Sequence, residues 1–160
     1  MNVLGIDPGL SGALCILDPV ERGVEIIDMP VVELERNKKI KREVAAAMVH
    51  DALVGQDIEF AFLERVGAMP GQGVTSMLSL GRSVGVIEGV VAAMGIPLTL
   101  VIPQRWQKDM LVRGGKDGSR ERAMQLFPMQ ADLFKRKKDD GRADAALIAL
   151  WGEKFGRNSR

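Results

Sequence analysis

The chain has 160 residues, of which 46% are hydrophobic, and its formal net charge is only +1 at pH 7. This length and composition predict one globular domain, residues 1–160, with a substantial core. One cysteine and one histidine exclude an internal disulfide and any metal site built from several Cys or His ligands, so a bound metal would need oxygen ligands. The N-terminus lacks a signal-peptide pattern and no apolar run approaches membrane-spanning length, so we expect a cytoplasmic protein without membrane contact.

The two parts of the chain differ in charge. Residues 1–100 carry 8 Lys and Arg against 13 Asp and Glu, a balance of −5, whereas residues 101–160 carry 14 against 8, a balance of +6. This asymmetry predicts a basic face contributed by the C-terminal part, and the alternative is an ordinary solvated surface.

The opening stretch, VLGIDPGLSGALCIL, joins two apolar runs through a Pro-Gly and Ser-Gly turn. We predict strands over residues 3–7 and 13–18, paired as a hairpin. Asp7 ends the first strand, where burial of a carboxylate is costly unless a cation neutralises it. The glycines at 5, 9 and 12 would leave room for a phosphate or another backbone. The alternative is that Asp7 merely caps the turn.

A third strand is predicted over residues 24–29, followed by the charged segment VVELERNKKIKREV, whose first half we interpret as a loop. Residues 41–53 fit a helix better, because Val44, Met48 and Leu53 can share one face. The run IEFAFL at 58–63 is typical of a strand covered on both faces, and it ends on Glu64.

The loop 67–73 leads into a helix predicted over residues 76–94, in which Gly81, Gly85 and Gly89 lie on one face. Each of these glycines costs about 1 kcal/mol of helix propensity relative to Ala, so another backbone should approach closely. We favour the sheet of the same chain as that backbone, with a partner subunit's helix as the alternative.

A strand over residues 97–102, a short helix over 104–111 with Trp106 inside, a helix over 119–126 and a closing helix over 142–154 complete the pattern. Strands and helices alternate without a repeat or a linker. We therefore predict an α/β fold, a mixed five-stranded sheet with helices on both faces.

Four acidic residues stand at the ends of these elements. Asp7 and Glu64 each end a strand, while Asp140 and Asp144 are four residues apart at the last helix and can point the same way. Groups at neighbouring strand ends of an open α/β sheet converge in one crevice. Four carboxylates there would repel one another without cations, and oxygen ligands are what a two-magnesium phosphodiester site requires. Each acid taken alone is more often a cap or a surface charge, and Asp139 competes with Asp140.

The motifs IDPGLSGA, FLERV with MPGQGVTSM, LGRSVGVIEG, IPQRWQKDM and KKDDGRADAALIA, in this order, resemble RuvC-type Holliday-junction resolvases of the form found in phages and some bacterial genomes. The resemblance covers most of the chain and leaves residues 20–55 without a matching motif. It implies a ribonuclease-H-like fold, a homodimer, and paired symmetric nicking of four-way DNA junctions with two Mg²⁺ ions, for which Mn²⁺ can substitute. It also implies the cytoplasm of a bacterial cell, at the nucleoid, or of a phage-infected host.

By position, Asp7, Glu64, Asp140 and Asp144 match the catalytic and metal-binding acids of that family. The last two are four residues apart rather than the more familiar three. This departure leaves the third ligand open between Asp139 and Asp140.

The expected nucleic-acid contacts are Arg65, Met69, Arg105, Lys108, Lys116, Lys137 and Lys138, within a basic segment that also holds Arg113, Arg120 and Lys135. Lysines and arginines on phosphates set affinity and register without reading sequence. The loop around Met69 would stand beside the junction centre and could wedge between bases, although packing is the default role of a methionine.

Three other functions fit parts of this pattern. An ATP-binding domain of the sugar-kinase and actin type shares the Asp-Gly opening, but it needs two such domains. A related nuclease acting on RNA, or on branched or flap DNA, would use the same acids. A non-catalytic junction-binding protein would keep the fold, and the presence of all four acids argues against it.

Overall fold

The computed structural model describes residues 1–36, 38–67 and 71–156. Its strands are β1 (Asn2–Asp7), β2 (Ala13–Leu17), β3 (Val24–Asp28), β4 (Val31–Arg36), β5 (Lys39–Val44), β6 (Ile58–Glu64) and β7 (Leu98–Val101). Its helices are α1 (Ala46–Leu53), α2 (Val74–Ala93), α3 (Pro103–Asp109), α4 (Gly118–Leu126) and α5 (Asp140–Trp151). Short 3₁₀ turns cover Gly115–Asp117, Pro128–Phe134 and Lys137–Asp139, and a π turn, Gly152–Gly156, extends α5.

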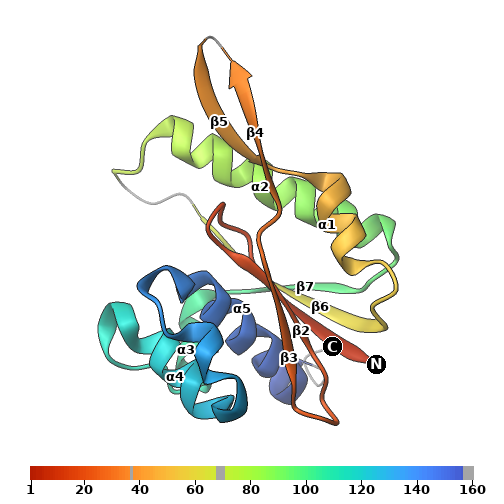
Figure 1. Ribbon diagram of the computed structural model, residues 1–160, viewed down its shortest axis with the longest axis vertical. Coiled ribbons are helices and arrows are strands. Elements are labelled where there is room, and N and C mark those ends of the chain that lie inside the picture. Colours follow the sequence, from red (N-terminus) through yellow and green to blue (C-terminus); the bar gives the residue numbers. More distant parts are fainter. Residues whose placement is uncertain (37, 68–70, 157–160) are drawn as a thin grey trace.

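Five strands form one mixed sheet in the order β3-β2-β1-β6-β7. β2 is antiparallel to both β1 and β3, whereas β1, β6 and β7 run parallel. Helices α1 and α2 lie on one face of this sheet, and α3, α4 and α5 lie on the other (Figure 1). The predicted fold class is therefore confirmed.

Side chains that alternate along β1 serve both layers. Leu4 and Ile6 pack in the core beneath α1 and α2, while Val3 packs in the core that includes α5. Gly5 lies directly under α5, because a β-carbon at this position would stand 2.2 Å from the Ala145 carbonyl oxygen. The space predicted beside Gly5 is therefore occupied by the backbone of α5.

The segment 31–44 is the main departure from prediction. It forms an antiparallel pair rather than a loop leading into a helix, with Val31 opposite Val44 and Arg36 opposite Lys39. This hairpin projects beyond the five-stranded sheet, alongside α2 (Figure 1). The helix that follows begins only at Ala46.

Helix α2 presents an apolar face to the outside. Nothing in the described structure lies within 4 Å of a β-carbon placed at Gly81, Gly85 or Gly89, so the favoured prediction that the chain's own sheet approaches these glycines is wrong. Leu78, on the same face, is 73% exposed. By length and composition alone, α2 could cross a membrane, so the expectation that no apolar run reaches membrane-spanning length is also wrong. Core helices of soluble proteins can be equally long and apolar.

Candidate active site

Asp7 and Glu64 end two adjacent parallel strands that are in register. Gly5 pairs with Phe62 and Ile6 with Leu63, so the two acids follow at the same edge of the sheet. Successive side chains of a strand point to opposite faces, and Gly5 lies under α5. Asp7 and Glu64 therefore belong to the α5 face.

Asp7 is partly buried, and the turn that follows β1 folds back against it. One carboxylate oxygen, Oδ1, accepts a hydrogen bond of 3.1 Å from the Gly9 backbone N–H. Burial raises the pKa of Asp7 above its usual value, and the Gly9 hydrogen bond opposes that rise. Asp7 therefore does cap the turn, as the alternative interpretation expected, but only through Oδ1. The other oxygen, Oδ2, faces residues of other elements.

Helix α5 rests on the same turn through Gly141. A β-carbon at position 141 would stand 2.5 Å from the Ser11 carbonyl oxygen and 2.9 Å from Asp7 Oδ2. Only glycine permits this approach, which brings the N-terminal part of α5 against Asp7. Because α5 begins at Asp140, two residues earlier than predicted, Asp144 lies in its second turn rather than its first.

The acids of the two strands and of α5 act on one another electrostatically. Burial and then the charge of Asp7 raise the pKa of Glu64 to about 7, against the opposing effect of the Trp106 hydrogen bond. Burial also raises the pKa of Asp144 to about 7, with a contribution from Asp7 and Asp140 and an opposing one from Ser119. Asp144 Oδ1 is buried and finds no hydrogen-bond partner within the described residues. Within the described residues no cation offsets the repulsion that raises the pKa values of Glu64 and Asp144.

Whether these residues suit a metal ion depends on their chemistry and their separation. Within residues 1–36, 38–67 and 71–156, no group of three or more Asp, Glu, His or Cys side chains is gathered closely enough to hold an ion as it stands. The shared electrostatics and the unpartnered Asp144 oxygen nevertheless suit a hard cation with oxygen ligands.

Asp139 and Asp140 have different surroundings. Asp139 is 1% exposed and accepts hydrogen bonds from the Arg136 backbone N–H at 2.8 Å and from Arg136 Nη2 at 2.8 Å. Asp140 is half exposed, pairs with Arg120, and contributes to the raised pKa of Asp144. Asp139 is thus committed to the turn before α5, whereas Asp140 is exposed and acts electrostatically on Asp144.

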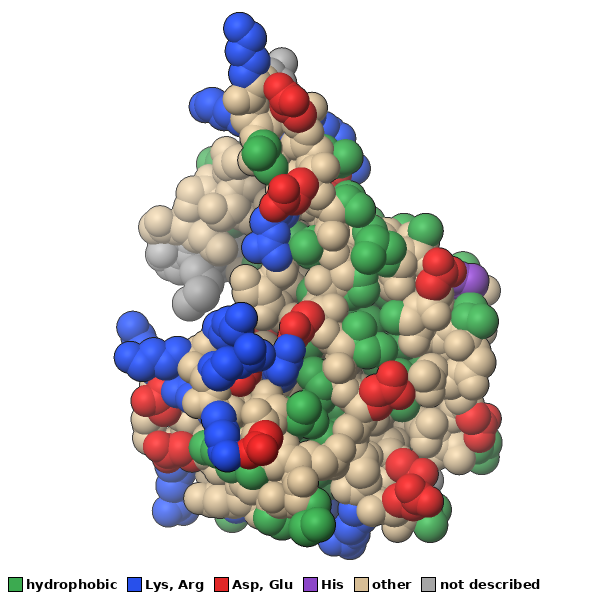
Figure 2. Space-filling model, in the orientation of Figure 1, with side chains coloured by type: hydrophobic (Ala, Val, Ile, Leu, Met, Phe, Trp, Pro, Cys, Tyr) green, Lys and Arg blue, Asp and Glu red, His purple; other side chains and the backbone are tan. Residues whose placement is uncertain are grey.

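The predicted basic contacts lie mostly on exposed turns of the helical layer. Lys116 stands in the turn before α4, Lys137 and Lys138 stand in the turn before α5, and Lys108 lies on α3; all four are exposed. Lys and Arg side chains gather over this layer, on the side toward the hairpin, and again at the hairpin tip (Figure 2).

Other predicted contacts stand apart from this group. Arg65 is exposed directly after Glu64, whereas Met69 lies outside the described residues. Arg105 stacks over the Trp151 ring, 5.3 Å from its centroid, at the far end of α5 from the acids. Arg120 is not a free phosphate contact, because it is buried and donates to Asp117, to Asp140 and to the Lys135 carbonyl oxygen.

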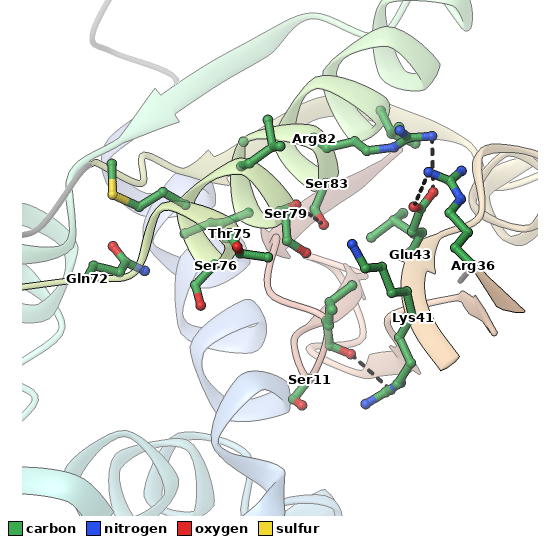
Figure 3. Close-up of a pocket in the computed structure, with 18 residues that line it drawn as sticks. Ser11, Arg36, Lys41, Glu43, Gln72, Thr75, Ser76, Ser79, Arg82 and Ser83 are labelled. Atoms are coloured by element: carbon green, nitrogen blue, oxygen red, sulfur yellow. Dashed lines mark hydrogen bonds and ion pairs between the residues drawn. The ribbon is translucent and has the colours of Figure 1, made fainter. Parts of the chain in front are cut away.

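Sequence reasoning missed a groove with a basic rim between the hairpin and α2. A cavity of about 1000 Å³ lies between the β4–β5 hairpin, α2 and the turn at Leu10 and Ser11 (Figure 3). Its rim carries basic side chains from the hairpin, namely Arg36, Lys41 and Arg42. Glu43 fixes the hairpin on α2 through a 3.0 Å ion pair with Arg82. The alternation of VVELER and KIKREV was the available signal, and their charges obscured it.

Comparisons with known proteins agree with this architecture. No protein-family model matches the sequence. The chain is 31% identical to the chloroplastic Holliday junction resolvase MOC1 of Chlamydomonas reinhardtii, over 78% of this chain but only 17% of that protein's length. Its structure resembles that of T. thermophilus RuvC in complex with a Holliday junction substrate, with a TM-score of 0.69, 16% identity, and coverage of 99% of this chain and 96% of that one. The fold is that of RuvC.

Two further structures share the RuvC fold. A second Thermus thermophilus RuvC structure gives a TM-score of 0.59 at 17% identity, covering 98% of this chain and 96% of that one. The yeast mitochondrial Holliday junction resolvase Ydc2 gives 0.55 at 17% identity, covering 92% and 75%. In this chain's version of the RuvC fold, Asp7 and Glu64 end their strands, and Asp140 and Asp144 lie in the first two turns of the last helix.

Proposed function

We propose that this chain is a structure-selective DNA endonuclease that resolves four-way junctions by paired symmetric nicks. The observation that carries the proposal is that Asp7, Glu64 and Asp144, which come from three separate elements, repel one another, which raises the pKa values of Glu64 and Asp144, and that no described cation offsets this repulsion. The RuvC fold and the sequence similarity to a junction resolvase support the same activity.

In this proposal Asp7, Glu64, Asp140 and Asp144 hold two Mg²⁺ ions, with Mn²⁺ able to substitute. Bound ions supply a nucleophile from water at neutral pH and stabilise the charge that develops on the phosphodiester. The chain contributes an all-oxygen donor set and a rigid frame, because Gly141 locks α5 against the Asp7 turn. Asp7 and Asp144 would offer carboxylate oxygens to the ions, and the burial of these side chains limits the access of bulk water to the site.

Two nicks on strands of like polarity require two sites, and we propose that a homodimer supplies them. The outer face of α2 fits this role, since Val74 and Leu78 are exposed there and the glycine stripe is open to close approach. Small residues on a helix face allow another helix to pack tightly against it. Sedimentation of the wild-type protein and of a Gly85→Glu variant tests this pairing, since a charge on the packed face should shift a dimer to a monomer.

The DNA would lie across the basic turns that precede α4 and α5 and reach the hairpin groove. Lys116 is exposed in the turn before α4, Lys137 and Lys138 are exposed in the turn before α5, and Lys39 and Lys41 face solvent on the hairpin. Exposed positive charge on these turns and on the hairpin suits a DNA backbone that passes over metal-bound acids. Arg65 follows Glu64 directly and would meet DNA close to the cut.

The experiment is incubation of end-labelled mobile four-way junctions with the protein, with and without Mg²⁺, and mapping of cuts on all four strands. We expect metal-dependent cuts at symmetric positions on two opposing strands. An RNA–DNA hybrid and a flap substrate run in parallel, and preferential cutting of either would assign the acids to the related nuclease instead. Tight junction binding without any cutting would indicate the non-catalytic alternative.

A further inference from the structure

Glu64 accepts a hydrogen bond from a neutral donor on another element. Trp106 Nε1 donates a hydrogen bond of 3.0 Å to Glu64 Oε1, across 42 residues of sequence. The Trp106 side chain is fully buried. An indole N–H only donates, so it requires a carboxylate oxygen that accepts.

The strand and helix around Trp106 determine where its indole lies. The Arg65 backbone N–H donates to the Val101 carbonyl oxygen at 2.7 Å, which continues the β6–β7 pairing past Glu64. Pro103 begins α3 one residue after β7, and the hydrogen bond from Trp106 to Glu64 brings the first turn of α3 to the end of β6. Trp106 packs in the same core cluster as Val101 and Met110, which fixes the direction of its N–H.

A neutral donor has a specific advantage beside a cation site. It occupies one oxygen of Glu64 and restricts the carboxylate to one orientation, but it leaves the negative charge in place for a divalent ion. Asp140 differs, because Arg120 brings a full positive charge to it at 2.7 Å. Polar groups that hold metal ligands in this way commonly change metal affinity by roughly 10- to 100-fold when removed.

We propose that Trp106 is the positioning residue for Glu64, holding Oε1 so that the other carboxylate oxygen is directed to the cation shared with Asp7 and Asp144. This inference rests on the proposed function, because it takes Glu64 to be a metal ligand. Because Trp106 is fully buried, it acts in this proposal only through its hydrogen bond to Glu64.

The chain offers a matched control. Trp151 is also buried, and its indole N–H donates to Asp109 Oδ2 at 2.8 Å, away from the candidate site. Trp106→Phe and Trp151→Phe therefore each remove one buried indole–carboxylate hydrogen bond while keeping an aromatic ring. Mn²⁺ binding by each variant, without DNA, is measured by calorimetry, and the Mg²⁺ concentration for half-maximal junction cleavage is measured separately.

We expect Trp106→Phe to weaken Mn²⁺ binding and to raise the half-maximal Mg²⁺ concentration by roughly 10- to 100-fold, with junction binding in EDTA unchanged. Trp151→Phe should leave both quantities as in the wild type. Equal Mn²⁺ affinity in the wild type and Trp106→Phe, or an equal loss in Trp151→Phe, would overturn the positioning role. Failure of the wild type to bind Mn²⁺ at all would instead overturn the metal site, and with it the proposed function.

A second measurement needs no variant, which guards against a Trp106→Phe protein that fails to fold. The chain contains two tryptophans, so its NMR spectrum has two indole N–H signals. Addition of Mg²⁺ to the wild-type protein should move the Trp106 signal and leave the Trp151 signal in place. Two stationary signals at a Mg²⁺ concentration that supports cleavage would contradict the proposal.

Discussion

Arg120 and Asp140 are joined by a hydrogen bond of 2.7 Å from Nε to Oδ1, and the Arg120 side chain is only 9% exposed. Arg120 also bonds Asp117 and the Lys135 carbonyl oxygen, so α4 is tied to the start of α5. The most exposed of the four acids is thus held in place by a buried cation. Its neighbour, Asp139, is held by Arg136 instead. We therefore expect substitutions of these two adjacent aspartates to have different effects.

Asp139→Asn should reduce stability and retain cleavage. Asp139 is buried and accepts several hydrogen bonds from Arg136, so its neutralisation should cost about 1.5–3 kcal/mol of unfolding free energy. Asp140→Asn should abolish cleavage, and it should also reduce stability, because the buried Arg120 loses its charged partner at 2.7 Å. Chemical denaturation and junction cleavage of both variants measure this difference, and a cleavage defect confined to Asp139→Asn would reverse the assignment of the third acid.

Gly141→Ala should separate α5 from the Asp7 turn. A methyl group at this position would clash with the Ser11 carbonyl oxygen and Asp7 Oδ2, and overpacking of this kind costs about 1–3 kcal/mol. Cleavage should fall further than stability alone explains, because α5 carries Asp144. Gly23→Ala is the control, since nothing in the described structure lies within 4 Å of a β-carbon there. Wild-type activity in folded Gly141→Ala would show that α5 need not approach Asp7 so closely.

The metal-free protein should lose stability as pH rises through neutrality. Burial and neighbouring acids raise the pKa of Glu64 and that of Asp144 to about 7, against ordinary values of 4.5 and 3.8. Because the folded state favours the protonated forms, this stabilisation is complete below the ordinary values and disappears as pH rises through 7. Thermal unfolding in EDTA at about pH 5 and about pH 8 measures the effect.

Mg²⁺ should restore the stability that is missing at the higher pH, since a ligand that binds the ionised folded state stabilises it. The Glu64→Gln and Asp144→Asn double variant, which cannot ionise at these positions, is the control and should show a smaller pH dependence. An unfolding temperature that is equal at both pH values in the wild type and the double variant would contradict the electrostatic account of these acids.

The hairpin should contribute to junction affinity through phosphates. Lys39→Ala with Lys41→Ala removes two exposed charges, and the slope of log K against log salt should become shallower by about 0.9 for each phosphate that the variant no longer neutralises. Lys154→Ala, an exposed lysine beyond α5, should leave the slope unchanged. Binding titrations at several salt concentrations provide the measurement, and an unaltered slope in the double variant would remove the hairpin from the DNA surface.

The parts of the site that follow from strand pattern could be predicted from sequence. The apolar runs ending in Asp7 and Glu64 indicated both strands, and the rule that strand ends meet in one crevice brought the acids together. The position of Asp140 relative to Asp139 could not be derived in this way, because one residue of helix rotation decides it. That rotation is set by contacts distant in sequence, namely those of Arg120 and Gly141.

The hairpin and the glycine stripe show two other limits. Segment 31–44 carries its charges on strands that are exposed along most of their length, so hydrophobic periodicity was too weak to indicate pairing. The glycines of α2 indicated close approach of another backbone, but a single sequence does not distinguish an approach within the chain from one between chains. The open space around them in the described part of the structure argues against the first choice.

The most direct test of the central claim compares the wild type with Asp7→Asn on a labelled four-way junction. Both proteins are assayed for binding in EDTA and for cleavage in Mg²⁺. The account predicts that Asp7→Asn binds the junction as the wild type does but no longer cuts it, because Asp7 is the buried acid shared by Glu64 and Asp144. Continued Mg²⁺-dependent cutting by Asp7→Asn would contradict the assignment of these acids as the active site.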